Sequence, residues 1–91
     1  MALGTAKISD PVGLHLRAAS AIVKLAKRFP CDIRISYDGL QTNAKSILGL
    51  ASLVARHGET LEIHAEGEQD EAALAALVAL IEVGLAEDSR S

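Results

Sequence analysis

A β-hairpin is predicted by residues 32–43, which read DIRISYDGLQTN. Apolar and polar residues alternate through 32–37, which is typical of a strand with one buried face. Asp38-Gly39 then supplies a residue pair that tight hairpin turns prefer, because these residues tolerate a positive φ. We therefore expect residues 40–43 to pair back and to start an antiparallel sheet.

Two further strands are predicted on either side of this hairpin. The clearest alternation in the chain lies at residues 60–66, and a weaker one lies at residues 2–8. Strands that are half apolar and half polar favour an antiparallel sheet with only one covered face.

Three helices are predicted to cover that face. The first spans about residues 16–28, and Pro30 prevents its continuation. Its apolar stripe consists of Ala18, Ile22, Leu25 and Phe29. Its basic face consists of Arg17, Ser20, Lys24, Lys27 and Arg28.

The second helix is expected to be short and to follow Ser46, whose side chain is suited to cap free N–H groups, and Gly58 is expected to close it. The third spans about residues 70–85 and has acidic residues in its first turn, where the helix dipole favours them. Their predicted core stripes are Ile47, Leu50, Ala51 and Val54 for the second helix, and Leu74, Leu77, Val78, Ile81 and Leu85 for the third.

The resulting order is βαββαβα. It predicts an α+β fold, a two-layer open-faced sandwich in which a four-stranded antiparallel sheet is covered on one face by three helices. A chain of 91 residues fits a single domain, here 1–91. Aromatic residues make up only 2% of the chain, so the core is expected to consist of Leu, Ile, Val and Ala.

Charge is distributed unevenly along the chain. Residues 1–58 hold eight Lys and Arg against three acids, whereas residues 59–91 hold nine acids against one Arg, giving +5 and −8. The first part is thus suited to an acidic protein partner. A single cysteine, Cys31, and the lack of a long apolar run predict a cytoplasmic protein without membrane insertion. We interpret Cys31 as a small buried hydrophobic residue.

His15 follows a glycine turn and precedes the first helix. The first N–H groups of a helix lack intrahelical partners and, with the helix dipole, form an anion site. A phosphoryl group on the imidazole could contact the N–H groups of Leu16 and Arg17 and the Arg17 guanidinium. The same dipole disfavours the imidazolium. A histidine in this place can equally be a helix cap or a solvated residue.

Two segments bear on that choice, GLHLRAA at residues 13–19 and KSILGLASL at residues 45–53. In sequence and spacing both resemble the HPr family of phosphotransferase-system carriers. The resemblance implies that Nδ1 of His15 accepts a phosphoryl group from enzyme I, itself charged by phosphoenolpyruvate, and passes it to an EIIA-type acceptor. Arg17 would stabilise the phosphate, and no cofactor would take part. The protein would be a stoichiometric carrier and not a freestanding enzyme.

The resemblance also implies a regulatory role for Ser46, which a dedicated HPr kinase/phosphorylase modifies in some lineages. A plain N-cap is the alternative for this residue. The expected docking surface combines Arg17 and Ser46 with Ser20, Lys24, Lys27, Ile47, Leu48 and Ala51. We expect the protein to be a monomer.

The sequence departs from the family pattern at two positions. Ala18 lies where proline is common, and Leu16 lies where a small residue is frequent and is predicted to narrow access to His15. Ala18 and the segment 28–31 resemble the nitrogen-related branch of the family. Neither change removes His15 or Arg17.

Two other functions remain open at this point. One is a mainly regulatory HPr-like protein that acts by binding according to the phosphorylation of Ser46 or His15, in carbon or nitrogen control. The other is an RNA- or ligand-binding module, which the lack of stacking aromatics disfavours, so no nucleic-acid partner is expected. No metal site is expected either, since His57 and His64 lie in different elements and are interpreted as surface residues.

Overall fold

The computed structural model describes residues 1–88. Four strands, β1 (Ala2–Lys7), β2 (Asp32–Tyr37), β3 (Leu40–Asn43) and β4 (Thr60–Glu66), alternate with helices. The helical elements are α1 (Leu16–Ala26), α2 (Ile47–Ala51), α3 (Asp70–Ala79), the π-helical turn η1 (Leu80–Gly84) and α4 (Leu85–Asp88). The last three follow one another without a break, so the predicted order βαββαβα is confirmed. The single-domain prediction extends to residues 89–91, which lie outside the described residues.

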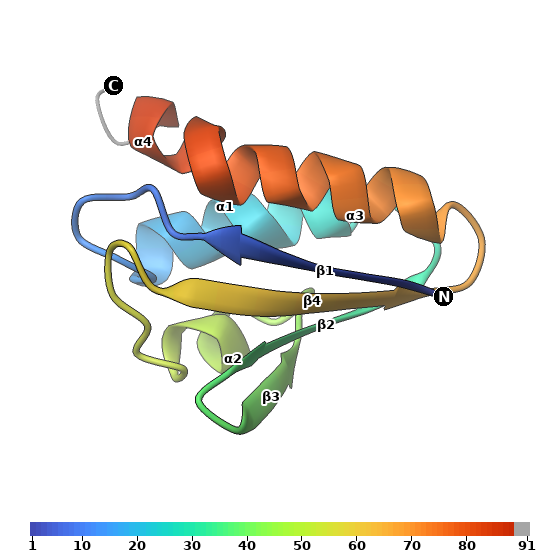
Figure 1. Cartoon of the computed structure of the whole chain (residues 1–91), viewed down its shortest axis with the longest axis horizontal. Helices are drawn as coiled ribbons and strands as arrows, with labels where there is room; N and C mark the ends of the chain where they lie inside the picture. The colour runs from blue at the N-terminus through green and yellow to red at the C-terminus, as the bar shows by residue number, and fades with distance from the viewer. Residues whose placement is uncertain (89–91) are drawn as a thin grey trace.

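The sheet has the strand order β1-β4-β2-β3, and each neighbouring pair is antiparallel. Helices α1 and α3 pack against each other and α2 packs against α1, so the helices form one layer on the sheet (Figure 1). This confirms the predicted α+β open-faced sandwich. Within residues 1–88, no helix has the length and apolar character needed to span a membrane.

The hairpin matches its prediction in both strands and turn. Residues from Arg34 to Tyr37 pair with residues from Asn43 to Leu40. Asp38 and Gly39 have φ values of 51° and 80°, the left-handed pair that a two-residue turn between twisted strands requires.

One cluster of buried side chains forms the core, and it is aliphatic as predicted. Phe29 and Tyr37 only pack against its edge. The largest fully buried apolar side chains are Ile8, Ile22, Ile33, Ile35, Leu50, Leu61, Ile63, Leu77, Ile81 and Leu85.

The predicted core face of the first helix is partly wrong. Helix α1 ends at Ala26 and not near Arg28, and Leu25 and Phe29 are only partly buried. Ala19, Val23 and Ala26 are buried instead. The buried face is rotated toward these residues because α1 contacts both α2 and α3, and small side chains permit that close packing.

The predicted second helix is too long, and two members of its core stripe are wrong. Helix α2 has five residues, and Val54 adopts a left-handed φ of 56° that ends the helical path well before Gly58. Ile47 and Val54 are 39% and 70% exposed. Leu50 is fully buried, and the turn that follows α2 buries Leu53 and Ala55 in their place. Helical periodicity therefore predicted the wrong buried residues after Ala51, because the chain is no longer helical there.

The third helix contains a π turn that the sequence did not predict. In η1 the carbonyl oxygen of Ile81 accepts hydrogen bonds from the Ser9 backbone N–H (3.0 Å) and the Ser9 hydroxyl (2.6 Å). The Ser9 hydroxyl oxygen also accepts the Ala86 N–H at 3.3 Å. Ser9 thus satisfies backbone groups around the π turn, which fixes the chain just before Asp10.

Candidate functional site

His15 is the N-cap residue of α1. Its backbone is extended (φ −92°, ψ −177°), and its Nδ1 accepts a hydrogen bond from the Arg17 N–H at 3.2 Å. The His15 carbonyl accepts the first helical hydrogen bond, from the Ala19 N–H at 2.9 Å. The imidazole remains 33% exposed, so Nδ1 lies at the helix N-terminus within reach of solvent.

The neighbouring side chains leave the approach to this helix end open. Leu16 is 59% exposed and Arg17 is exposed, whereas Ala18 is buried beneath them. Helix α1 has eleven residues and no acidic residue in its first turn. Its dipole and its first N–H groups therefore favour an anion at His15.

Asp10 completes the site, and sequence reasoning missed it. Its carboxylate is 2% exposed, and its Oδ2 lies 3.3 Å from Nε2 of His15. Its Oδ1 accepts the Val12 N–H at 2.8 Å. The sequence does not predict this contact, because the separation of Asp10 from His15 spans a turn and follows no helix or strand period. The one sequence signal for it is that Asp10 begins the Asp-Pro turn that precedes His15.

A second loop fixes the His15 segment from the side. The Leu14 N–H donates to the Ala55 carbonyl at 2.9 Å, and Nδ1 of His57 lies 3.1 Å from the Asp10 carbonyl. Gly13 has a φ of +93°, and a Cβ there would lie 2.7 Å from the Ala55 carbonyl oxygen. Only glycine fits both constraints, so the turn before His15 depends on this close approach.

Ser46 is the N-cap residue of α2, as predicted. Its hydroxyl oxygen accepts the Gly49 N–H at 3.1 Å, and the residue is half-buried. Lys45 beside it is directed inward, since its Nζ donates to the carbonyls of Phe29 (2.9 Å) and Cys31 (3.0 Å). Lys45 therefore joins α2 to the end of α1 and adds little charge to the surface.

The predicted docking residues lie on two helices that pack against each other, α1 and α2. Leu48 is 77% exposed and Ile47 is 39% exposed. Lys24 and Lys27 are exposed, and Ser20 and Ala51 are half-buried. The structure thus combines cationic side chains from α1 with apolar ones from α2.

Of the other residues considered from sequence, Cys31 is internal, His57 contacts the Asp10 segment and His64 lies on the open face of the sheet. Cys31 is a buried free thiol, as predicted. His57 is exposed but bound to the Asp10 segment, and His64 is 34% exposed, with its Nε2 3.7 Å from Oε1 of Glu66. Among residues 1–88, no cluster of three or more His, Cys, Asp or Glu side chains is placed to hold a metal ion.

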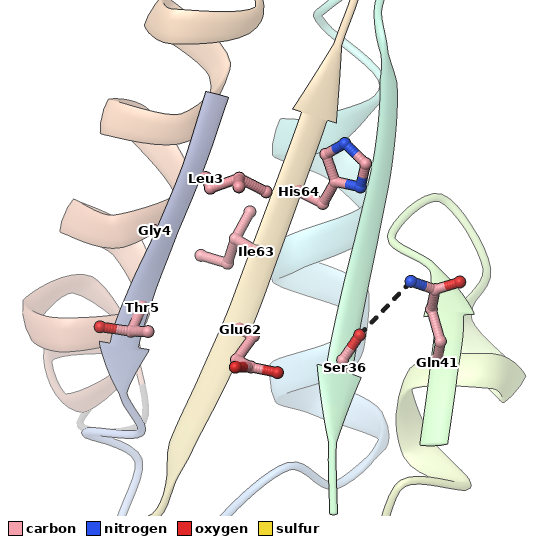
Figure 2. A pocket seen from close by; sticks show the side chains of 8 residues that line it. All are labelled: Leu3, Gly4, Thr5, Ser36, Gln41, Glu62, Ile63 and His64. Atoms are coloured by element: carbon pink, nitrogen blue, oxygen red, sulfur yellow. Dashed lines mark hydrogen bonds between the residues drawn. The ribbon is translucent and has the colours of Figure 1, made fainter. Parts of the chain in front are cut away.

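A hollow of about 400 Å³ lies on the open face of the sheet, away from the helices (Figure 2). His64, Glu62 and Ser36 contribute side chains to it, together with Leu3 and Thr5 from β1 and Gln41 from β3. None of the predicted site residues lines it.

Two ion or hydrogen-bond pairs shift pKa values outside the His15 site. The Tyr37 hydroxyl donates to Oε2 of Glu59 at 2.6 Å, which raises the pKa of Tyr37 and lowers the pKa of Glu59. A hydrogen bond and ion pair with the N-terminal amine lowers the pKa of Asp70 and raises that of the amine. Glu59 also accepts the Arg56 N–H at 2.7 Å, so this pair stabilises the loop that contacts the His15 segment.

A family model, related sequences and solved structures all match this chain to the same family. Residues 4–83 match the family model PTS-HPr, described as the PTS HPr component phosphorylation site. The chain is 41% identical to the phosphocarrier protein HPr of Mycoplasma genitalium over 78 residues, which cover 85% of this chain and 89% of that protein.

Solved structures agree in fold over nearly the whole length. The crystal structure of HPr-C-His from Thermoanaerobacter tengcongensis has a TM-score of 0.87 at 39% identity and covers 93% of this chain and 96% of that chain. Bacillus subtilis Crh, described as a catabolite repression protein and as a domain-swapped dimer, has a TM-score of 0.72 at 36% identity, with coverage of 89% and 93%.

Proposed function

This chain belongs to the HPr family of phosphotransferase-system phosphocarriers, and we propose that it accepts a phosphoryl group from phospho-enzyme I on His15 and transfers it to an EIIA-type acceptor. The observation that carries the proposal is the position of Nδ1, which accepts the Arg17 N–H at the N-terminus of α1. A ring nitrogen that accepts a hydrogen bond has a lone pair directed outward, and that lone pair is the nucleophile.

Bond formation at Nδ1 would release the Arg17 N–H from its present acceptor. The N–H groups of Leu16 and Arg17 and the Arg17 guanidinium would then bind the phosphoryl oxygens, and the dipole of α1 would favour the added negative charge. The site thus exchanges a weak neutral hydrogen bond for charge-assisted ones. The phosphoryl group remains exposed for the next acceptor, because His15 is 33% exposed.

The test is phosphorylation of the full chain by phosphoenolpyruvate and a cognate enzyme I. We expect intact-mass spectrometry to find one acid-labile phosphoryl group on the wild type and on His64→Ala, and none on His15→Ala. His64 is the matched control because it lies on the open face of the sheet (Figure 2). An unmodified wild type, or an adduct that persists in His15→Ala, would contradict the proposal.

We further propose that partners dock on the surface formed by α1 and α2. Its cationic part consists of Arg17, Lys24 and Lys27, with Ser20 between them, and its apolar part consists of Ile47, Leu48 and Ala51. Exposed apolar side chains next to cations suit an acidic partner with an apolar centre. We place this carrier in the cytoplasm as a single-domain monomer spanning 1–91, although the related Crh is described as a dimer.

A regulatory function is the second candidate, and it is favoured by the half-buried Ser46 hydroxyl at the start of α2 and by the similarity to Crh. A phosphate on Ser46, added by an HPr kinase/phosphorylase, would place about two negative charges beside the docking surface and repel an acidic partner. Ser46→Asp and Ser46→Asn both preserve a capping oxygen, but only the first adds charge. Weaker enzyme I binding by Ser46→Asp alone supports regulation, and equal binding by the two variants contradicts it.

A further inference from the structure

We propose that Asp10 is a positioning residue that holds the proton of His15 on Nε2 and so keeps Nδ1 unprotonated for phosphoryl transfer. This inference rests on the proposed function, because it assigns the residue that prepares the acceptor nitrogen. Asp10 is the one buried charged residue in the described part of the chain, and it lies next to a half-exposed histidine.

The surroundings of Asp10 fix the direction of its carboxylate. Oδ1 accepts the Val12 N–H at 2.8 Å, which closes the turn at Pro11. The Asp10 carbonyl accepts the Gly13 N–H at 3.0 Å and the Nδ1–H of His57 at 3.1 Å. With its main chain and Oδ1 engaged, Asp10 has Oδ2 left to face the His15 ring, 3.3 Å from Nε2.

The two partners of the His15 ring admit one neutral tautomer. A carboxylate only accepts, so Nε2 must donate, and a backbone N–H only donates, so Nδ1 must accept. The contact between Nδ1 and the Arg17 N–H is 3.2 Å. The opposite tautomer would direct an N–H at the N–H of Arg17 and a lone pair at a buried carboxylate. Both contacts would then be repulsive, and the second would be costly because the Asp10 carboxylate is 2% exposed.

The same arrangement fits the transfer step. The Nδ1 lone pair forms the N–P bond while the bond from phosphorus to the donor atom breaks, and the donor keeps that electron pair. The proton remains on Nε2, so the imidazole ring gains positive charge as the bond forms. Oδ2 of Asp10 lies beside that nitrogen and stabilises the charge. On transfer to the next acceptor the ring leaves as a neutral imidazole with the proton still on Nε2.

Asp10→Asn tests this with almost no change in shape. The Val12 N–H still needs an acceptor, so the amide oxygen must take the place of Oδ1, and the amide NH₂ then faces His15. Because that NH₂ donates to Nε2, the imidazole proton must lie on Nδ1. In this tautomer Nδ1 has no free lone pair to attack phosphorus. We expect uptake of phosphoryl groups at His15 to fall by about ten- to a hundredfold.

Two readouts are measured on the full chain. Nitrogen NMR of histidine-labelled protein at mildly alkaline pH reports the tautomer of His15, assigned by comparison with His15→Ala. Phosphoramidate, a small phosphoryl donor that needs no enzyme, reports the reactivity of Nδ1. Asp32→Asn, which removes the same charge from an exposed strand position, is the control and should match the wild type in both.

A proton on Nδ1 in the wild type overturns the proposal, even if Asp10→Asn does not fold. An Asp10→Asn protein that folds and takes up phosphoryl groups at the wild-type rate also overturns it. Loading of His15 by phosphoramidate but not by phospho-enzyme I would contradict the proposed function and leave the role of Asp10 supported. A purely structural role of Asp10 would change stability without changing the tautomer.

Discussion

The N-termini of α1 and α2 carry the two candidate phosphorylation sites, and they are constructed differently. At α1 the cap is an imidazole nitrogen, the helix has eleven residues, and a buried carboxylate contacts the other side of the ring. At α2 the cap is the Ser46 hydroxyl, the helix has five residues, and the adjacent Lys45 is occupied by the carbonyls of Phe29 and Cys31. The first end therefore combines a ring nitrogen with a buried carboxylate, whereas the second presents a capping hydroxyl without such a partner among the described residues.

If both ends are phosphorylated, the difference predicts that only the Ser46 end needs an added general base. A histidine nitrogen that accepts a hydrogen bond already carries its reactive lone pair. A serine hydroxyl keeps a proton that must be removed before it can attack phosphorus, and no general base contacts Ser46 in the described part of the chain. Under the proposed function, modification of Ser46 would therefore require a kinase, while His15 would require only a phosphoryl donor.

The largest expected effect comes from the glycines that accompany the two caps. In Gly13→Ala a Cβ at positive φ would lie 2.7 Å from a backbone oxygen that cannot move aside. In Gly49→Ala the clash is with the Thr42 side chain, which can rotate. We expect Gly13→Ala to lower the free energy of unfolding by about 3 kcal/mol and Gly49→Ala by about 1 kcal/mol. Urea denaturation followed by circular dichroism measures both.

Gly58→Ala separates the two causes at Gly13. Gly58 also has a positive φ, of +83°, but open space surrounds its missing Cβ. It should lose about 1 kcal/mol from backbone strain alone. If Gly13→Ala and Gly58→Ala proved equally stable, the contact between the His15 turn and Ala55 would be unimportant.

Removal of the Arg17 guanidinium tests the electrostatic difference between the helix ends. If it binds the phosphoryl group, Arg17→Ala should weaken phosphoryl retention by about 1.5–3 kcal/mol, or roughly ten- to a hundredfold. Arg17→Lys should recover only part of this, because lysine lacks the planar fork. The rates of phosphoryl gain and hydrolysis at His15 provide the measurement. Arg34→Ala, on the open face of the sheet, should leave these rates unchanged. If it changed them as much as Arg17→Ala does, the cause would be the net charge of the protein and not contact with the phosphoryl group.

Ser46→Ala should destabilise the protein by about 1 kcal/mol through loss of the N-cap, without changing phosphoryl uptake at His15. Ser52→Ala is the matched control, since its hydroxyl donates to the Gly49 carbonyl at the exposed other end of the same helix. Thermal unfolding and the His15 phosphorylation rate are measured on both variants. A large fall in that rate with Ser46→Ala would mean that the two helix ends are coupled.

The smallest effect concerns the loop at residues 55–59, which follows α2 and contacts the His15 segment. The chain has one tyrosine and no tryptophan, so phenolate absorbance reports Tyr37 alone. Its pKa should lie above 10.0 in the wild type and return toward that value in Glu59→Gln. Because folding lowers the pKa of Glu59 below 4.5, its contribution is present above that pH and is lost as the pH falls through the lower folded value. An unshifted Tyr37 would contradict the hydrogen bond.

The strands were predictable because alternation has a short period and the turn residues define its limits. Residues 32–37, 40–43 and 60–66 were predicted with the bounds that the structure has. The start of the short α2 after Ser46 was predicted too, but its end and its buried face were not, since five residues give too little periodicity and the turn after it buries Leu53 and Ala55. The π turn depends on hydrogen bonds from Ser9, which is far from Ile81 in the sequence.

The sequence by itself determined the hairpin, the element order and the position of His15 before a helix, because each follows from residues that are close together in the chain. Only the tertiary structure decided which residue accompanies each reactive atom. Asp10 faces His15 because Ile81 and Ala86, which bind Ser9, together with Ala55 and His57 hold the turn from other parts of the chain. Contacts between distant segments have no sequence period, and they arise only when the core brings those segments together.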